Sequence, residues 1–206
     1  MFWRHGGGYR LMRSIIWLLL WPLERMTVVG LEKIPAEGGA LVVANHQSML
    51  DIPVIGTRVK RSITFVARDT LRKNPILRFV LHTCGGITVK RGSADRAALA
   101  AIIAALEAGE CVAIFPEGTR SKDGEVKAFQ RGALVVAKRA GVPIIPVGLA
   151  GTGAAWPAGQ ALPGPGRIGM VVGDAIAPDT PDAAEVARAA VAELVLRADA
   201  ARGARG

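Results

Sequence analysis

Residues 44–51, Ala-Asn-His-Gln-Ser-Met-Leu-Asp, follow the apolar run 39–43, Gly-Ala-Leu-Val-Val. That run is typical of a buried strand, and residues 52–56 indicate the continuation of a helix. A histidine at a strand-to-helix junction lies at the edge where open α/β sheets build their sites. His46 and Asp51 are five residues apart, so the carboxylate can accept a hydrogen bond from one ring nitrogen and leave the other as a base. The alternative is a satisfied polar pair without a catalytic role.

Apolar runs of strand length alternate with stretches of helical composition along the rest of the chain. A short strand and turn is expected at 28–35, and strands at 62–67, 84–92, 111–115, 142–149 and 167–173. Helices are expected at 70–81, 96–108, 129–138 and 182–200. No internal repeat or linker interrupts them. The alternation predicts a single α/β domain, residues 28–206, with a largely parallel or mixed central sheet flanked by helices. A length of 206 residues fits one such domain after an N-terminal segment, residues 1–27.

The charge balance of the chain points to an acidic partner. Lys and Arg number 26 against 17 Asp and Glu, which gives a net charge of +9 and a pI near 10.4. Nucleic acid, an anionic membrane or a phosphorylated substrate would meet that charge. An aromatic content of 5% argues against single-stranded nucleic acid, which needs stacking rings. Cys84 and Cys111 have neither metal-ligand spacing nor a disulfide framework, so we expect small buried hydrophobes, compatible with a reducing cytoplasm.

The N-terminal segment combines arginines with a short apolar run. The run covers residues 15–23, about half of the roughly 20 residues that a spanning helix needs. Trp17 and Trp21 are four residues apart, on one face of a helix, and Arg10 and Arg13 flank them. This pattern predicts an amphipathic helix lying on a membrane surface. A signal peptide is a rival, but no small-residue cleavage site follows; a helix packed on the domain core is the other alternative.

A second polar segment follows the expected strand 111–115. Residues 116–121 read Pro-Glu-Gly-Thr-Arg-Ser. Gly118 lets the backbone approach a ligand, Thr119 can donate a hydrogen bond, and Arg120 offers a planar fork that matches phosphate oxygens. Glu117 could hold the loop by pairing with an arginine. We therefore expect a phosphate-binding loop at the same sheet edge as the histidine, the alternative being an ordinary capped turn with an exposed arginine.

One further cation and one further block complete the pattern. Arg68 directly follows the expected strand 62–67 and so should lie at the same edge. Four segments in this order resemble the glycerolipid acyltransferases, especially 1-acylglycerol-3-phosphate (lysophosphatidic acid) acyltransferases: the His-four residues-Asp (HX4D) motif at 46–51, then 86–91, 115–121 and 142–146. The resemblance covers roughly residues 28–178. The second block departs from the family, because Lys90 rather than an aspartate precedes Arg91, so no role for that acid is carried over.

The resemblance implies an activity and a set of site residues. Family members transfer a fatty acyl chain from acyl-CoA or acyl carrier protein to the free sn-2 hydroxyl of a lysophospholipid at a membrane. By resemblance, His46 is the general base and Asp51 orients it, without a cofactor or metal. The same resemblance places substrate contacts, chiefly to phosphate, at Arg68, Arg91, Glu117, Gly118, Thr119 and Arg120. The expected partners are the lysophospholipid, the acyl thioester, an anionic membrane surface and an acyl carrier protein, with no nucleic acid.

The chemistry of the residues agrees with these roles. A lipid hydroxyl is a poor nucleophile near pH 7, and a positioned imidazole that removes its proton contributes about 100- to 10,000-fold. A covalent hydrolase using Ser48 or Ser121 is a competing interpretation, but the chain has no Gly-x-Ser-x-Gly elbow. Glycerol 3-phosphate, another lysophospholipid or lyso-ornithine lipid could replace the acceptor. A noncatalytic basic protein bound to membrane or nucleic acid is a distant alternative. We expect a peripheral or monotopic protein on the cytoplasmic face of a membrane.

Overall fold

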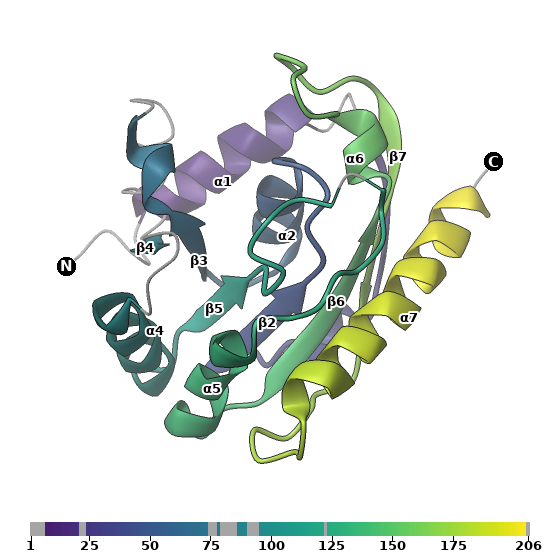
Figure 1. The fold of residues 1–206 in the computed structure, drawn as a ribbon. Helices are drawn as coiled ribbons and strands as arrows, with labels where there is room; N and C mark the ends of the chain where they lie inside the picture. Colours follow the sequence, from purple (N-terminus) through teal and green to yellow (C-terminus); the bar gives the residue numbers. More distant parts are fainter. Residues whose placement is uncertain are drawn as a thin grey trace.

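A seven-stranded mixed sheet forms the middle layer of the chain in this computed structural model (Figure 1), which describes residues 7–20, 24–73, 78, 86–89, 95–121 and 123–204. The strands lie in the order β1-β7-β6-β2-β5-β3-β4. All neighbouring pairs are parallel except β6 and β7, which are antiparallel. The predicted α/β class with a largely parallel or mixed sheet is therefore confirmed. The strand bounds are β1 Glu24–Val29, β2 Ala40–Ala44, β3 Ile63–Arg68, β4 Ile87–Val89, β5 Cys111–Ile114, β6 Ile144–Ala150 and β7 Gly166–Val172.

The helices cover both faces of this sheet (Figure 1). Their bounds are α1 Gly7–Leu20, α2 Asp51–Arg58, α4 Arg96–Glu107, α5 Arg131–Ala140, α6 Thr152–Ala155 and α7 Ala183–Gly203, with 3₁₀ turns η1 Leu31–Lys33 and η2 Asp69–Lys73. The helices expected at 96–108, 129–138 and 182–200 are present with ends shifted by a few residues. The connection between β6 and β7 contains the short helix α6. The helix expected at 70–81 starts within η2, and most of its remainder lies outside the described residues.

Alternating side chains of the strands feed two hydrophobic layers. Val42 of β2 packs in one cluster with Val54 and Ile55 of α2. Leu41, its neighbour in β2, packs in the other cluster, which contains apolar residues of α4, α5 and α7. Successive residues of a strand point to opposite faces, so a strand buried on both faces must be apolar throughout. That requirement explains the unbroken run before His46, all of β2 being buried.

Helix α1 packs on the domain by one side and exposes apolar residues on another. The buried Tyr9 hydroxyl accepts a hydrogen bond from the Ile63 amide, and Arg13 donates to the Val59 carbonyl. Leu11 and Leu18 are each 63% exposed. Among the described residues, no helix has the length and hydropathy needed to cross a membrane. Strand β1 starts before residue 28, so the expected boundary between the N-terminal segment and the domain falls inside this strand.

Candidate active site

Three neighbouring parallel strands deliver the polar segments to one edge of the sheet. In the β2–β5 register Val43 lies beside Ile114, and in the β3–β5 register Phe65 lies beside Ala113. Parallel strands end on the same side of the sheet, so the residues that follow them meet there. The 45–51 turn leaves β2, the 115–121 loop leaves β5, and Arg68 is the last residue of β3.

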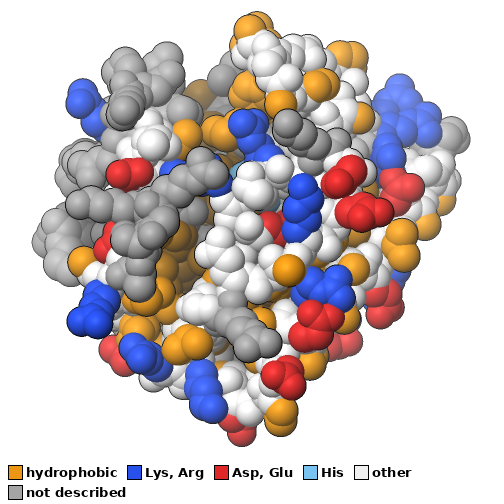
Figure 2. All heavy atoms as spheres, viewed as in Figure 1, with side chains coloured by type: hydrophobic (Ala, Val, Ile, Leu, Met, Phe, Trp, Pro, Cys, Tyr) orange, Lys and Arg blue, Asp and Glu red, His pale blue; other side chains and the backbone are white. Residues whose placement is uncertain are grey.

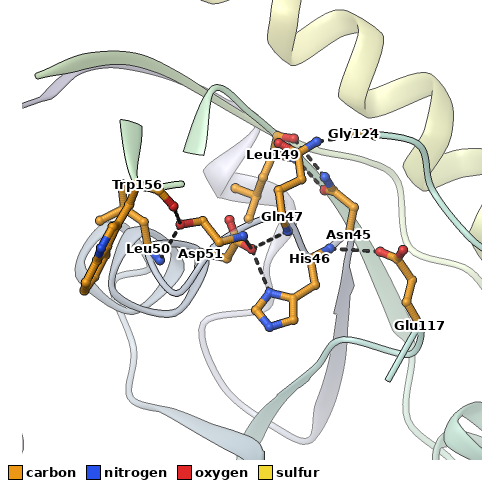
Figure 3. A network of polar contacts seen from close by, with 10 residues as sticks. Asn45, His46, Gln47, Leu50, Asp51, Glu117, Gly124, Leu149 and Trp156 are labelled. Atoms are coloured by element: carbon orange, nitrogen blue, oxygen red, sulfur yellow. Dashed lines mark hydrogen bonds and ion pairs between the residues drawn. The ribbon is translucent and has the colours of Figure 1, made fainter. Parts of the chain in front are cut away.

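His46 is held as an oriented imidazole at this edge. Its Nδ1 lies 2.7 Å from Asp51 Oδ2, and the ring stacks on Phe115 with centroids 4.2 Å apart. The His46 side chain is 16% exposed, whereas the Asp51 side chain is fully buried. Figure 3 shows Nδ1 turned toward Asp51 and the ring extending away from the strand. Nε2 has no hydrogen-bond partner among the described residues, so it is the nitrogen that can exchange a proton.

Asp51 is a carboxylate built into the start of a helix. Its Oδ2 also accepts hydrogen bonds of 2.8 Å from the backbone amides of Gln47 and Ser48. Asp51 is the first residue of α2, where the helix dipole favours negative charge. Its other oxygen, Oδ1, is buried and has no partner within the described part of the chain. The amides and the helix end together hold the carboxylate in one place, with the imidazole on the remaining side of Oδ2.

The side chains around His46 attach the turn to distant parts of the chain (Figure 3). Asn45 exchanges two hydrogen bonds with the backbone of Leu149, at 2.8 and 2.9 Å. Gln47 donates to the Gly124 carbonyl, and the Ser48 hydroxyl donates to that of Trp156. The motifs alone do not indicate a structural role for these three side chains. The signal that could have found them is that polar residues directly follow a buried strand, where each polar group needs a partner.

The expected pairing of Glu117 with an arginine is not seen among the described residues, where its carboxylate binds two backbone amides. Its Oε1 accepts a 2.9 Å hydrogen bond from the His46 amide, and its Oε2 accepts one from the Lys127 amide at 3.1 Å. Glu117 is 7% exposed. Burial raises the pKa of its carboxyl, and the two amide hydrogen bonds oppose that increase. The two carboxylate oxygens of Glu117 therefore supply hydrogen-bond acceptors to two backbone amides, a role for which an arginine side chain has no acceptor atom.

The remaining expected substrate contacts differ in their surroundings. The Arg68 guanidinium donates a hydrogen bond to the Gly118 carbonyl. Thr119 and Arg120 are exposed, and the Arg120 guanidinium has no hydrogen-bond or ion-pair partner within the described part of the chain. Gly118 has a φ of +69°, a left-handed conformation that favours glycine. Arg91 lies outside the described residues.

A cavity of about 640 Å³ connects these groups to an apolar interior. His46, Arg68, Gly118, Thr119 and Arg120 all line it. Its other walls include apolar side chains of β3, η2, α4 and β5, namely Val66, Leu71, Leu99, Ile102 and Ile114. Figure 2 shows a recess lined largely by hydrophobic side chains, with basic side chains near it. The cavity can therefore receive a molecule that is part anionic and part apolar.

No group of three or more His, Cys, Asp or Glu residues suited to a metal ion occurs among the residues that the structure describes. The polar side chains that line the cavity are the His46 imidazole, the Arg68 and Arg120 guanidinium groups, the Thr70 and Thr119 hydroxyls, the Gln130 amide and the Asp95 carboxylate. This set can remove a proton from a neutral hydroxyl and bind an anion. It is suited to acyl transfer onto a phosphorylated alcohol.

Comparison with known proteins agrees with this geometry. The chain is 34% identical over 144 residues to a chloroplastic 1-acyl-sn-glycerol-3-phosphate acyltransferase of Arabidopsis thaliana, covering 68% of this chain and 40% of that protein. It is 31% identical over 148 residues to a 1-acyl-sn-glycerol-3-phosphate acyltransferase of Borreliella burgdorferi, covering 70% and 59%. The chain thus spans about half the length of these relatives.

A solved structure extends the similarity to the fold. The crystal structure of the 1-acyl-sn-glycerophosphate (LPA) acyltransferase PlsC from Thermotoga maritima superposes with a TM-score of 0.77 at 32% identity, covering 92% of this chain and 77% of that one. The family model described as Acyltransferase matches residues 25–150, which include the His46 turn, Arg68 and the 115–121 loop. The chain belongs to this acyltransferase family.

Proposed function

We propose that the protein transfers a fatty acyl chain from an acyl-CoA or acyl carrier protein thioester to the sn-2 hydroxyl of 1-acylglycerol 3-phosphate, giving phosphatidic acid. One observation carries the proposal: the His46–Asp51 pair lies at the same cavity as the Gly118–Arg120 loop, with His46 in its wall. The names of the related proteins support this acceptor. The apolar walls suit an acyl chain, and the guanidinium groups suit a phosphate.

The reaction follows from the orientation of the imidazole. Nε2 of His46 takes the proton of the acceptor hydroxyl while its oxygen attacks the thioester carbonyl carbon. The tetrahedral intermediate then collapses, the carbon–sulfur bond breaks, and the imidazolium returns the proton to the departing sulfur. Asp51 keeps the ring oriented and stabilises the imidazolium, as the aspartate of a serine protease triad does. The thioester supplies the activation, so the scheme needs no resident cofactor or metal.

The phosphate of the acceptor would be bound by the exposed end of the 117–121 loop. Arg120 and Thr119 present donors to the cavity, and an arginine fork can bind two phosphate oxygens at once. Arg68 would reach the phosphate from β3 while it orders the loop through the Gly118 carbonyl. Arg91 is proposed as a further contact, on the family resemblance alone. Held at the phosphate, the glycerol unit can extend its sn-2 hydroxyl toward Nε2.

The activity is tested directly with the purified chain, lysophosphatidate and each of the two thioester donors. Phosphatidic acid, measured by mass spectrometry, should form with at least one donor. His46→Ala should lower the rate at least about 100-fold with an unchanged unfolding temperature. His5→Ala, the same substitution at another histidine, is the control. A panel with glycerol 3-phosphate, other lysophospholipids and lyso-ornithine lipid identifies the acceptor. Full activity of His46→Ala, or no product from lysophosphatidate, would refute the proposal.

We further propose that α1 lies on an anionic membrane surface. Leu11, Ile15 and Leu18 recur at helical spacing and are 44% to 63% exposed, and the exposed Arg10 lies on the same helix. An apolar stripe beside cations is the pattern of an interfacial helix. Burying one leucine contributes about 1.5–3 kcal/mol, so Leu18→Glu should weaken binding to phosphatidylglycerol-containing vesicles at least about tenfold. Leu196→Glu changes a leucine of α7 that is 72% exposed and should bind like the unmodified protein; equal binding of both variants would refute the role of α1.

A further inference from the structure

The 117–121 loop holds the backbone of His46 at both of its polar groups. The His46 amide donates to Glu117 Oε1 at 2.9 Å, and the His46 carbonyl accepts from the Ser121 amide at 2.7 Å. The two loop residues that make these contacts enclose Gly118, Thr119 and Arg120 in the sequence. The loop that carries Arg120, which lines the cavity, therefore also fixes the position of the His46 backbone.

Glu117 itself does not face the cavity. His46, Pro116, Gly118, Thr119 and Arg120 line the cavity, whereas Glu117 is not part of its wall and is 7% exposed. Both carboxylate oxygens are already used, one by the His46 amide and the other by the Lys127 amide. A buried acceptor with both oxygens engaged has nothing to offer a phosphate, which it would also repel.

The contact with Lys127 extends the attachment to the segment that leads into α5. Residues 123–130 connect the loop to that helix, and the backbone amide of Gln130 donates a hydrogen bond to the Pro116 carbonyl at 2.9 Å. Gln47 reaches the same connection through the Gly124 carbonyl. The histidine turn and the arginine loop are thereby joined into one unit through Glu117 and its neighbours.

We propose that Glu117 is a positioning residue that sets the His46 imidazole relative to Arg120, and not a substrate ligand. The inference rests on the proposed acyl transfer for its kinetic readout. A misplacement of about 1 Å can lower a rate about 100-fold even when binding is intact. Loss of the Glu117 carboxylate should therefore act on kcat, whereas loss of a phosphate ligand would act on KM.

Glu117→Gln tests this with little change in shape. Glutamine has one carbonyl oxygen, so one of the two amides is left facing an NH₂ group. We expect kcat to fall about 10- to 100-fold, with the KM for lysophosphatidate within about twofold of the unmodified protein. Glu125→Gln makes the same change on an exposed glutamate of the same connection and should leave both constants unchanged. A raised KM with an unchanged kcat would overturn the inference in favour of a substrate contact.

A double-mutant cycle separates positioning from independent binding. If Glu117 acts through His46, adding Glu117→Gln to His46→Ala should change the residual rate by less than about twofold. The dissociation constant of lysophosphatidate should likewise be equal for the single and double variants. Additive losses of rate, or weaker binding in the double variant, would overturn the inference. If the unmodified protein forms no phosphatidic acid, the proposed function fails, and a readout that does not need activity decides on Glu117.

That readout is the nuclear magnetic resonance signal of the imidazole. In protein with ¹⁵N-labelled histidine, His46→Ala assigns the His46 ring among the three histidines of the chain. Glu117→Gln should shift or broaden the His46 ring signals and leave the other two in place, because it displaces only this ring. Ring signals identical to those of the unmodified protein would overturn the inference. If Glu117→Gln does not fold, Glu117→Asp, which keeps the charge but is one methylene shorter, should give the same kcat-specific loss and ring shift.

Discussion

Replacement of Asp51 by asparagine tests the catalytic pair with the smallest possible change. The asparagine oxygen can take the place of Oδ2 and accept from the amides of Gln47 and Ser48, which now donate at 2.8 Å. Its NH₂ group then occupies the position of Oδ1, which has no partner among the described residues. The turn can therefore keep its shape while the negative charge beside the imidazole disappears.

The magnitude follows from the separation of the charges. Nδ1 and Oδ2 are 2.7 Å apart, which places the centres of the imidazolium and carboxylate charges about 4 Å apart. Two unit charges at about 4 Å interact by about 4 kcal/mol at an effective dielectric constant of about 20. The imidazolium forms only as the hydroxyl proton is removed, so this interaction stabilises the transition state and not the bound substrate. We therefore expect kcat to fall about 1000-fold, since each factor of ten corresponds to about 1.4 kcal/mol.

The assay is the formation of phosphatidic acid over a range of lysophosphatidate concentrations. KM should change by less than about threefold, because Asp51 is fully buried behind the histidine and touches no substrate. Asp179→Asn is the matched control, because it removes an exposed carboxylate far from the site. Asp179 is three residues beyond Ile176, which bridges to Ile144 at the start of β6, the end of this strand opposite to the site. A folded Asp51→Asn protein with a kcat within about fivefold of the native value would refute the reasoning that the charge stabilises an imidazolium.

Three further predictions concern binding, pH and packing. Arg120→Ala should raise the KM for lysophosphatidate about 10- to 100-fold with kcat largely retained, since a charged fork to phosphate contributes about 1.5–3 kcal/mol; an unchanged KM in the same assay would dismiss this contact. Burial raises the pKa of the Cys111 thiol to about 11, above the value near 8.5 in an unfolded chain. The contribution of the neutral thiol to the free energy of unfolding is therefore fully present below about pH 8.5, and about 3 kcal/mol of it is lost as the pH rises to 11. Urea unfolding at pH 8 and 10.5 should show a steeper loss than in Cys111→Ala, and equal losses would contradict it. Gly169→Ala places a Cβ 2.0 Å from the Ala198 carbonyl oxygen and should destabilise the fold by about 1–3 kcal/mol, whereas Gly203→Ala, with nothing within 4 Å, should not; equal urea midpoints would refute the close approach of α7.

The sequence predicted the edge of the sheet better than the contacts made there. Parallel strands necessarily end on one side, so the positions of His46, Arg68 and the 116–121 loop followed from the order of apolar runs. The partner of Glu117 did not follow, because it is a backbone amide 71 positions away in the sequence. Backbone amides are present at every residue except proline, and no sequence pattern marks which of them a folded loop will leave unpaired.

The strand bounds near the N-terminus show a related limit. Residues 24–27 are mixed in polarity, a composition that favours the segment before the domain over a strand within it. In the structure they belong to β1, which pairs in parallel with β7 at the edge of the sheet. An edge strand buries less of its surface than a central one, so its hydrophobic pattern is weaker and its start is harder to predict. The antiparallel pairing of β6 with β7 was likewise hard to predict, because it depends on the conformation of the connection that contains α6.

The two buried carboxylates beside His46 control different properties of the same residue. Asp51 contacts the ring, so it governs the charge that the ring can carry. Glu117 contacts the backbone, so it governs where the ring lies relative to the arginine loop. Neither acid is part of the cavity wall. Among the described residues, the Lys, Arg, Asp and Glu side chains that line the cavity are Arg68, Arg120 and Asp95. A phosphorylated substrate therefore meets cations at the edge of the sheet, while the negative charges that the proposed reaction needs remain screened behind the imidazole and the loop.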